Sequence, residues 1–187
     1  MKKFHKVKIN DHVYRLPVMK ISEDTGIAVF DMLSSRAMTR DSVFAVLDRI
    51  RDSGIKVGDV DYVLSAETKG ILLAKGIADF MRCEMVILRK SQKPYHPEVI
   101  KAAVNTYTTS GEHYLHLDAT LAPKLKGKRV LIVDDVLSTG SSLRAMEDIL
   151  HQVKAKVVGK AFVFVEGDTY LRSEALYAGK LPIIKED

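Results

Sequence analysis

The clearest pattern in the chain is a short apolar run that is followed at once by acidic and then by small polar residues. Residues 130–133 are all apolar and mostly β-branched, as expected for a strand buried on both faces. Asp134 and Asp135 come next, followed by the small residues at 138–142. Apolar residues from Leu143 onward recur at helical spacing. The pattern predicts a strand, a tight loop and the start of a helix.

The same alternation of strand and helix extends over most of the chain. Thr39 or Asp41 is positioned to cap the first helix, and Gly54 is positioned to end it. The predicted helices cover 39–54 and 71–80, and the predicted strands cover 61–65, 85–88, 130–133 and 156–166, with 171–179 and 181–184 completing the domain. Strands alternating with helices are typical of an α/β fold with a parallel sheet.

Two segments depart from this alternation. Residues 1–35 contain no helical pattern, and residues 6–9 and 12–16 alternate around Asn10 and Asp11, which predicts a hairpin in a small N-terminal flap. Residues 90–118 carry prolines, Gly111 and a Thr/Ser cluster around alternating apolar positions, which predicts a long flexible hairpin that serves as a lid. We expect one domain over residues 1–187, with the flap at 1–35 and the core at 36–187.

Composition narrows the class of protein. The chain has 187 residues, 47% hydrophobic and 28% charged, as in an ordinary globular protein. No apolar run approaches 18 residues and the basic N-terminus lacks an apolar segment, so we expect neither a membrane span nor a secretory signal. The single cysteine, Cys83, suits a reducing cytoplasm. The net charge of +5 suits an anionic small molecule, and no basic stripe with interleaved aromatic residues indicates nucleic-acid binding.

The residues after the apolar run suggest a specific ligand. A small-residue loop that leads into a helix N-terminus presents unpaired N–H groups to a phosphate. Asp134 and Asp135 are acceptors for the hydroxyls of a diol, so the pair and the loop together suit a ribose 5-phosphate. The stretch lacks the Gly-Lys-Ser/Thr of a nucleoside-triphosphate loop and the spaced glycines of a dinucleotide fold. The plainer interpretation is a buried strand, an acidic turn and a Ser-rich helix cap.

Residues 130–142 resemble the 5-phosphoribosyl 1-diphosphate (PRPP) motif of the type I phosphoribosyltransferases. Residues 66–70 resemble the acidic-Ser-Arg-Gly loop of adenine phosphoribosyltransferases, with Thr68 and Lys69 in place of Ser and Arg. In those enzymes this loop contains a non-proline cis peptide. By itself the second loop is a weak signal that plain helix capping would also explain. The resemblance covers roughly residues 25–166 and implies a Rossmann-like parallel core, a small hood over the base and a lid.

The resemblance also implies an activity: transfer of 5-phosphoribose from PRPP to a purine base, releasing diphosphate, in purine salvage by a cytoplasmic homodimer. Mg²⁺ would be the cofactor, held by Asp134 and Asp135 through water or substrate. Asp134, Asp135 and Glu112 are the catalytic candidates, and Val29 and Phe30 the base-binding candidates. The implied PRPP-binding residues are Glu67, Thr68, Lys69, Gly70, Arg89, Lys90, Lys93, Tyr107, Asp134, Asp135, Val136, Leu137, Ser138, Thr139, Gly140, Ser141 and Ser142.

The identity of the base stays open at this point. Adenine phosphoribosyltransferases carry an acid shortly after the lid tyrosine, whereas this chain has Thr108 and Ser110 there and its acid, Glu112, is displaced. The lid resembles xanthine phosphoribosyltransferases and purine-repressor effector domains about as much. Adenine is the first candidate, and xanthine, hypoxanthine and guanine are alternatives. A non-catalytic PRPP sensor and a generic nucleotide binder are the rival classes of function.

Overall fold

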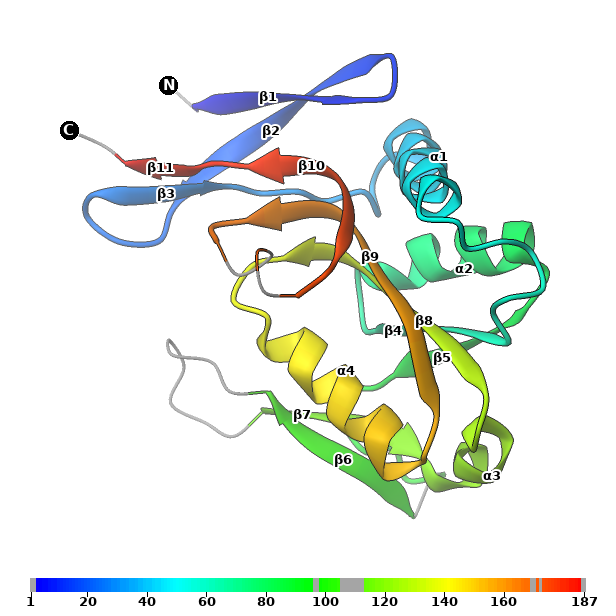
Figure 1. Cartoon of the computed structure of the whole chain (residues 1–187). Helices are drawn as coiled ribbons and strands as arrows, with labels where there is room; N and C mark the ends of the chain where they lie inside the picture. The colour runs from blue at the N-terminus through cyan, green and yellow to red at the C-terminus, as the bar shows by residue number, and fades with distance from the viewer. Residues whose placement is uncertain (1–2, 96–97, 105–112, 169–170, 172, 186–187) are drawn as a thin grey trace.

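A sheet of five parallel strands forms the centre of the computed structural model, which describes residues 3–95, 98–104, 113–168, 171 and 173–185. The strand order is β10-β9-β8-β4-β5, and every neighbouring pair is parallel (Figure 1). These strands are β4 (Tyr62–Ala66), β5 (Glu84–Leu88), β8 (Arg129–Leu137), β9 (Lys156–Glu166) and β10 (Leu176–Leu181). The predicted parallel α/β core is therefore confirmed.

Helices cover both faces of this sheet. Helices α1 (Arg36–Asp52) and α2 (Gly70–Met81) lie on one face, and α4 (Ser141–Gln152) lies on the other (Figure 1). Leu131 and Val133 of β8 belong to the core on the α1 and α2 side, whereas Val130 and Ile132 belong to the core on the α4 side. All four are fully buried, which explains the unbroken apolar run, because side chains of a strand alternate between faces. Among the described helices, none is long and apolar enough to cross a membrane.

The first helix begins earlier than its sequence suggested. Ser35 is the N-cap, and its hydroxyl accepts a hydrogen bond from the N–H of Met38 at 3.2 Å. The prediction that Thr39 or Asp41 caps the helix is wrong. Both side chains have other partners: the Thr39 hydroxyl donates to the carbonyl of Met32 at 2.7 Å. Asp41 is buried and accepts a hydrogen bond from the hydroxyl of Tyr14 at 2.6 Å.

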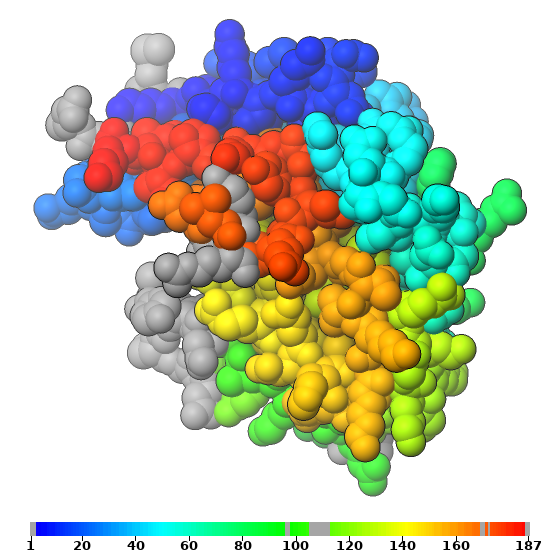
Figure 2. All heavy atoms as spheres, viewed as in Figure 1, coloured from blue at the N-terminus to red at the C-terminus, as the bar shows by residue number. Residues whose placement is uncertain are grey.

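The N-terminal flap forms a separate sheet with the order β1-β2-β3-β11. Its strands are β1 (Phe4–Ile9), β2 (His12–Lys20), β3 (Thr25–Ala28) and β11 (Ile183–Lys185). The hairpin around Asn10 is confirmed, and Asn10 has a φ of 51° in the turn. The sheet also includes a strand from outside the expected flap at 1–35, because β11 pairs antiparallel with β3. Figure 2 shows the N-terminal and C-terminal segments side by side at the top of the molecule. We call this sheet the hood.

The predicted lid begins as a hairpin that is anchored in the core. Strands β6 (Val99–Val104) and β7 (His113–Asp118) pair antiparallel, and a short 3₁₀ helix (Ala119–Leu121) and α3 (Ala122–Leu125) lead on to β8. Ala102, Leu115 and Leu117 are buried in the same cluster as α4. The tip of the hairpin, with the predicted lid residues Tyr107, Thr108, Ser110 and Glu112, lies outside the described residues. The closing movement therefore stays a prediction.

An ion pair joins the starts of the two central strands. Asp61, just before β4, accepts hydrogen bonds from the backbone N–H of Arg129 at 2.8 Å and from its guanidinium at 3.0 and 3.2 Å. These hydrogen bonds lower the pKa of Asp61 from 3.8 to about 2. The pair fixes the N-terminal ends of β4 and β8 and so helps to set the register of the strands that carry the acidic loops.

We expect Asp61→Asn to lower the free energy of unfolding by about 1–2 kcal/mol at pH 7, because Arg129 loses a charged acceptor. The Asp61 carboxyl ionises near pH 3.8 when unfolded and near pH 2 when folded, so its contribution is complete above pH 3.8 and is lost as the pH falls toward 2. Urea unfolding of wild type and variant should therefore differ at pH 7 and converge near pH 2. Glu23→Gln, at an exposed turn, is the control, and a difference that persists at pH 2 would contradict this assignment.

Candidate active site

The two acidic residues lie together at the carboxyl end of β8, next to the start of α2. The backbone N–H of Asp135 donates to the Asp134 carboxylate at 2.9 Å. Burial, and then the charge of Asp135, raise the pKa of Asp134 from 3.8 to about 8. Burial also raises the pKa of Asp135, although the nearby Lys69 opposes the shift. Both carboxyls thus resist ionisation, and a diol or a cation that arrives there would find acceptor oxygens in an enclosed setting.

Gly70, the first residue of α2, makes room for this carboxyl. A Cβ added at Gly70 would lie 2.5 Å from a carboxylate oxygen of Asp134 and would overlap the hydroxyl of Ser65 as well. The Ser65 hydroxyl is buried and has no hydrogen-bond partner within the part of the chain that the structure describes. The predicted site residue Gly70 is therefore required by contact between two loops, a role that its position before a helix does not reveal.

Lys69 connects three parts of the site. Its amine donates to the backbone carbonyl of Phe30 in the hood at 2.9 Å and lies 3.7 Å from the carboxylate of Asp135. The peptide bond between Glu67 and Thr68 in the same loop is cis, the feature that the resemblance to adenine phosphoribosyltransferases implied. The loop that follows β4 therefore brings a cation and exposed backbone groups to the acidic pair.

Glu67 and Arg89 form an ion pair at the edge of this loop. The guanidinium of Arg89 lies 2.5 Å from one carboxylate oxygen of Glu67, and the N–H of Lys90 donates to the other at 3.0 Å. Burial disfavours the ionised form of Glu67, but these hydrogen bonds outweigh it and hold the pKa of Glu67 below its usual value. Arg89 is thus already paired with an acid in this structure.

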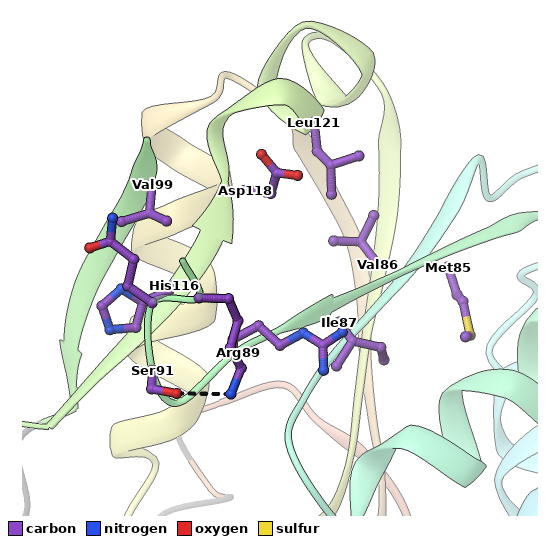
Figure 3. A pocket seen from close by; sticks show the side chains of 11 residues that line it. Met85, Val86, Ile87, Arg89, Ser91, Val99, His116, Asp118 and Leu121 are labelled. Atoms are coloured by element: carbon purple, nitrogen blue, oxygen red, sulfur yellow. Dashed lines mark hydrogen bonds between the residues drawn. The ribbon is translucent and has the colours of Figure 1, made fainter. Parts of the chain in front are cut away.

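Three cations that the resemblance assigns to PRPP binding, Arg89, Lys90 and Lys93, line two different pockets. Lys90 lines the main pocket beside Lys69, whereas Arg89 and Lys93 line a separate, smaller pocket (Figure 3). Successive side chains of an extended segment point to opposite sides. The side chains of Arg89 and Lys90, which follow β5, therefore face different pockets. Binding of PRPP by these three residues stays a prediction.

The small-residue loop after β8 has the geometry of an anion cradle. Gly140 has a φ of 75° and precedes α4, whose N-terminus has no side-chain cap. The hydroxyls of Thr139 and Ser141 lie 2.8 Å apart, and a cavity of about 90 Å³ opens along residues 136–143. The N-terminal N–H groups of a helix of this length provide donors and a positive dipole end for an anion. The Ser138 hydroxyl instead donates to Glu166 at the end of β9, at 2.8 Å.

The acidic pair and the loop after β4 line a pocket of about 660 Å³. Its volume falls within the range usual for small-molecule sites. It is lined by Ala66, Glu67, Thr68, Lys69, Lys90, Val104, His113, Tyr114, Leu115, Asp134, Asp135, Val136 and Ser142. The hairpin residues in this set were missed from the sequence, because they reach the site only through the fold of β6 and β7 across the end of the sheet. The alternation of apolar and polar residues in this segment predicted a hairpin, but it did not indicate that the hairpin lines the pocket.

The two base-binding candidates lie at different depths. The ring of Phe30 is only 2% exposed and packs edge-on against Phe164, with 4.9 Å between ring centroids. Val29 is half-buried and therefore more accessible. In this conformation Phe30 offers its backbone carbonyl to Lys69 and its ring to the core. Contact between either side chain and a base stays a prediction.

The acidic pair is the candidate for a metal ion. Across the described ranges, no group of three or more His, Cys, Asp or Glu side chains is arranged to hold a metal. Two adjacent carboxyls, Asp134 and Asp135, suit Mg²⁺, which is commonly bound through one or two carboxylates together with substrate oxygens and water. The residues present therefore fit a metal that arrives with an anionic substrate, and they do not form an all-protein cage.

Comparisons with known proteins agree with this geometry. The chain matches the phosphoribosyl transferase domain family over residues 35–184. It is 28% identical over 135 residues to adenine phosphoribosyltransferase of Brachyspira hyodysenteriae, covering 72% of this chain and 76% of that protein. It is 36% identical over 106 residues to adenine phosphoribosyltransferase of Petrotoga mobilis, covering 56% of this chain and 58% of that protein.

A solved structure supports the fold. The adenine phosphoribosyltransferase of Saccharomyces cerevisiae, in complex with an imino-altritol bisphosphate and adenine, is similar with a TM-score of 0.65. The match covers 93% of this chain and 92% of that one, at 21% sequence identity. The family match spans most of the chain, and this chain belongs to the phosphoribosyltransferase family.

We expect Asp134→Asn to stabilise the ligand-free protein at pH 8. The Asp134 carboxyl ionises near pH 3.8 when unfolded but only near pH 8 when folded. Stability is therefore lost as the pH rises through this window, because the folded state retains a proton that the unfolded chain releases. An amide avoids this loss, so thermal unfolding with EDTA should give a higher Tm for the variant at pH 8 and little difference at pH 4. Asp148→Asn, at an exposed position of α4, is the control, and an equal change at both pH values would contradict this assignment.

Proposed function

We propose that this protein transfers the 5-phosphoribosyl group of PRPP to a purine base, with adenine as the first candidate, giving AMP and diphosphate in purine salvage. The observation that carries the proposal is the meeting of three features around one pocket. These are the half-buried pair Asp134 and Asp135, the loop at 138–142 before α4, which lines an adjoining smaller cavity, and the loop at 66–70. Together they suit a ligand with a phosphate, a diol and a diphosphate.

The loop before α4 would bind the 5′-phosphate. Thr139, Ser141 and Ser142 offer hydroxyls, and Gly140 lets the backbone turn into the helix. Val136, Leu137 and Ser138 shape the rest of the loop, with Ser138 fixed by Glu166. Phosphate at a helix N-terminus gains hydrogen bonds and a favourable dipole. This contact would fix one end of PRPP before the reacting bond is engaged.

The acidic pair would bind the ribose hydroxyls. Asp134 and Asp135 accept hydrogen bonds from a diol and place negative charge beside a ribose that becomes positive as the diphosphate departs. Lys69, now 3.7 Å from Asp135, would turn with Lys90 toward the diphosphate and neutralise it. Glu67, held by Arg89, would fix the backbone of Thr68, Lys69 and Gly70 for this contact. Closure of the hairpin that carries Tyr107 would exclude water.

Mg²⁺ is the cofactor that we propose, bound with PRPP at Asp134 and Asp135 directly or through water. When bound, it would supply positive charge to the diphosphate and the ribose oxygens. The protein's own part is to keep the two carboxyls adjacent, as the hydrogen bond from the Asp135 N–H to Asp134 does. Asp135 and Glu112 are the candidates for taking a proton from the base.

Adenine is favoured because the related proteins described above are named adenine phosphoribosyltransferases. Val29 and Phe30 would lie against the base, where the hood approaches Lys69. Xanthine, hypoxanthine and guanine are the alternatives, together with a regulator that binds PRPP without turnover. The resemblance further supports a cytoplasmic homodimer and a single domain over residues 1–187, with the hood completed by β11.

Turnover of purine bases tests the proposed reaction. With PRPP and Mg²⁺ we expect conversion of adenine, measured by chromatographic separation of nucleotide from base, and less conversion of guanine, hypoxanthine or xanthine. The double variant Asp134→Asn with Asp135→Asn should lower kcat/KM by about 100-fold or more, because amides replace the carboxyl groups that would accept hydrogen bonds from the ribose hydroxyls. Asp148→Asn should behave as wild type. PRPP binding without turnover of any purine would assign the protein to the regulators, and unchanged turnover in the double variant would exclude the acidic pair as the site.

A substitution at Gly70 tests whether its close contact with Asp134 matters for PRPP binding. Gly70→Ala should raise the KM for PRPP about tenfold or more, because the new methyl group displaces the carboxyl of Asp134 by close contact. Adding Ser65→Ala removes one of the two overlaps and leaves the one with Asp134. The double variant should therefore remain impaired in steady-state kinetics. Full recovery in the double variant would show that the hydroxyl of Ser65, and not Asp134, makes the position intolerant.

A further inference from the structure

Ser65, the next-to-last residue of β4, carries a hydroxyl that the ligand-free protein does not use. The residue is fully buried, and its Oγ atom has no hydrogen-bond partner within the described part of the chain. A buried hydroxyl without a partner costs free energy, and buried polar atoms in native proteins are usually paired with protein, water or a ligand. The unpaired hydroxyl therefore indicates that Ser65 gains a partner in another state of the protein.

The position of Ser65 indicates which partner is within reach. Side chains alternate along a strand, and Val63, two residues earlier, belongs to the core on the α2 side of the sheet. A Cβ placed on Gly70, the first residue of α2, would lie 2.1 Å from Oγ of Ser65 and 2.5 Å from Oδ1 of Asp134. The hydroxyl and the carboxylate are thus near neighbours, although no hydrogen bond joins them in the ligand-free protein.

The carboxylate oxygen that faces Ser65 already has one backbone donor. Oδ1 of Asp134 accepts a hydrogen bond from the N–H of Asp135 at 2.9 Å, and a carboxylate oxygen can accept a second one. A second donor on Oδ1 would hold the carboxyl group in one orientation, toward the start of α2. Oδ2 of Asp134 would then remain available to a cation or a diol in the main pocket, which Asp134 lines.

We propose that Ser65 is a positioning residue whose hydroxyl donates to Oδ1 of Asp134 when Mg²⁺ and PRPP occupy the site. This role rests on the proposed transfer reaction and adds to it a residue that is too deeply buried to touch the ligand. Carboxylates that bind metal ions are themselves held by hydrogen bonds from outer groups, and loss of such a partner typically weakens metal binding or activity by about 10–100-fold. The ligand-free protein leaves the hydroxyl unpaired, and the loaded protein pairs it.

This role gives Ser65→Ala effects of opposite sign on stability and on binding. In the ligand-free protein the variant removes an unpaired buried hydroxyl, so its Tm, measured with EDTA, should equal or exceed that of wild type. Titration calorimetry with PRPP and Mg²⁺ should give an affinity about tenfold lower or more. The Mg²⁺ concentration that half-saturates PRPP binding should rise as well. A hydroxyl that only supports the fold would not separate stability from binding in this way.

Ser42 in α1 offers a matched control. It is also fully buried, and its hydroxyl also lacks a hydrogen-bond partner among the residues that the structure describes. Ser42 lines neither the main pocket nor the cavity along residues 136–143. Ser42→Ala therefore removes the same atom away from the acidic pair, and it should keep the wild-type affinity for PRPP without lowering the Tm.

Three results would overturn the role of Ser65. They are an unchanged PRPP affinity in Ser65→Ala, a lower Tm that accompanies weaker binding, and an equal loss of affinity in Ser42→Ala. None of these results bears on the proposed transfer reaction, which is judged by nucleotide formation in the wild-type protein. If the wild-type protein binds no PRPP, the transfer reaction and the role of Ser65 are both wrong, and the titration of wild type alone reveals that outcome.

Discussion

Asp134 and Asp135 follow the fully buried residues 130–133 within β8, and the enclosure of their carboxyl groups constrains the structure around them. Two adjacent carboxyls in an enclosed setting resist ionisation, which is why the pKa of Asp134 rises to about 8. The backbone N–H of Asp135 and the amine of Lys69 offset part of this penalty. The ligand-free site is therefore short of positive charge, and a substrate that brings a metal ion would supply it.

The loops around the acidic pair depend on each other through close contacts. A side chain at position 70 would overlap Asp134 and Ser65, so glycine fits there without displacing them. Lys69 spans from Asp135 to the carbonyl of Phe30, so the hood is connected to the core through the site itself. A change at any of these positions should be felt in substrate binding more than in folding, because the central sheet has its own apolar core on both faces.

Arg89, directly after β5, contacts the loop after β4 and also lines the smaller pocket. Its guanidinium holds Glu67 at the rim of the loop with the cis peptide, while its side chain lines the pocket beside His116. Lys90, one residue later, lines the main pocket instead. The alternation of side chains along an extended segment thus separates two adjacent cations into two binding environments.

Local pattern was sufficient for the parallel core, because the apolar run at 130–133 and the loop at 138–142 carry their signals within a few residues. The resemblance, and not local pattern, placed Gly70 and Lys69 in one candidate site with the acidic pair. The sequence did not reveal that Ser35, and not Thr39 or Asp41, caps α1. Asp41 is engaged by the distant Tyr14, and Thr39 bonds to the carbonyl of Met32 in the preceding loop. The membership of β11 in the hood, the lining of the main pocket by β7 and the separation of Arg89 from Lys90 were also decided only in three dimensions. Each depends on strand pairing or side-chain direction between segments far apart in the sequence, which no local periodicity encodes.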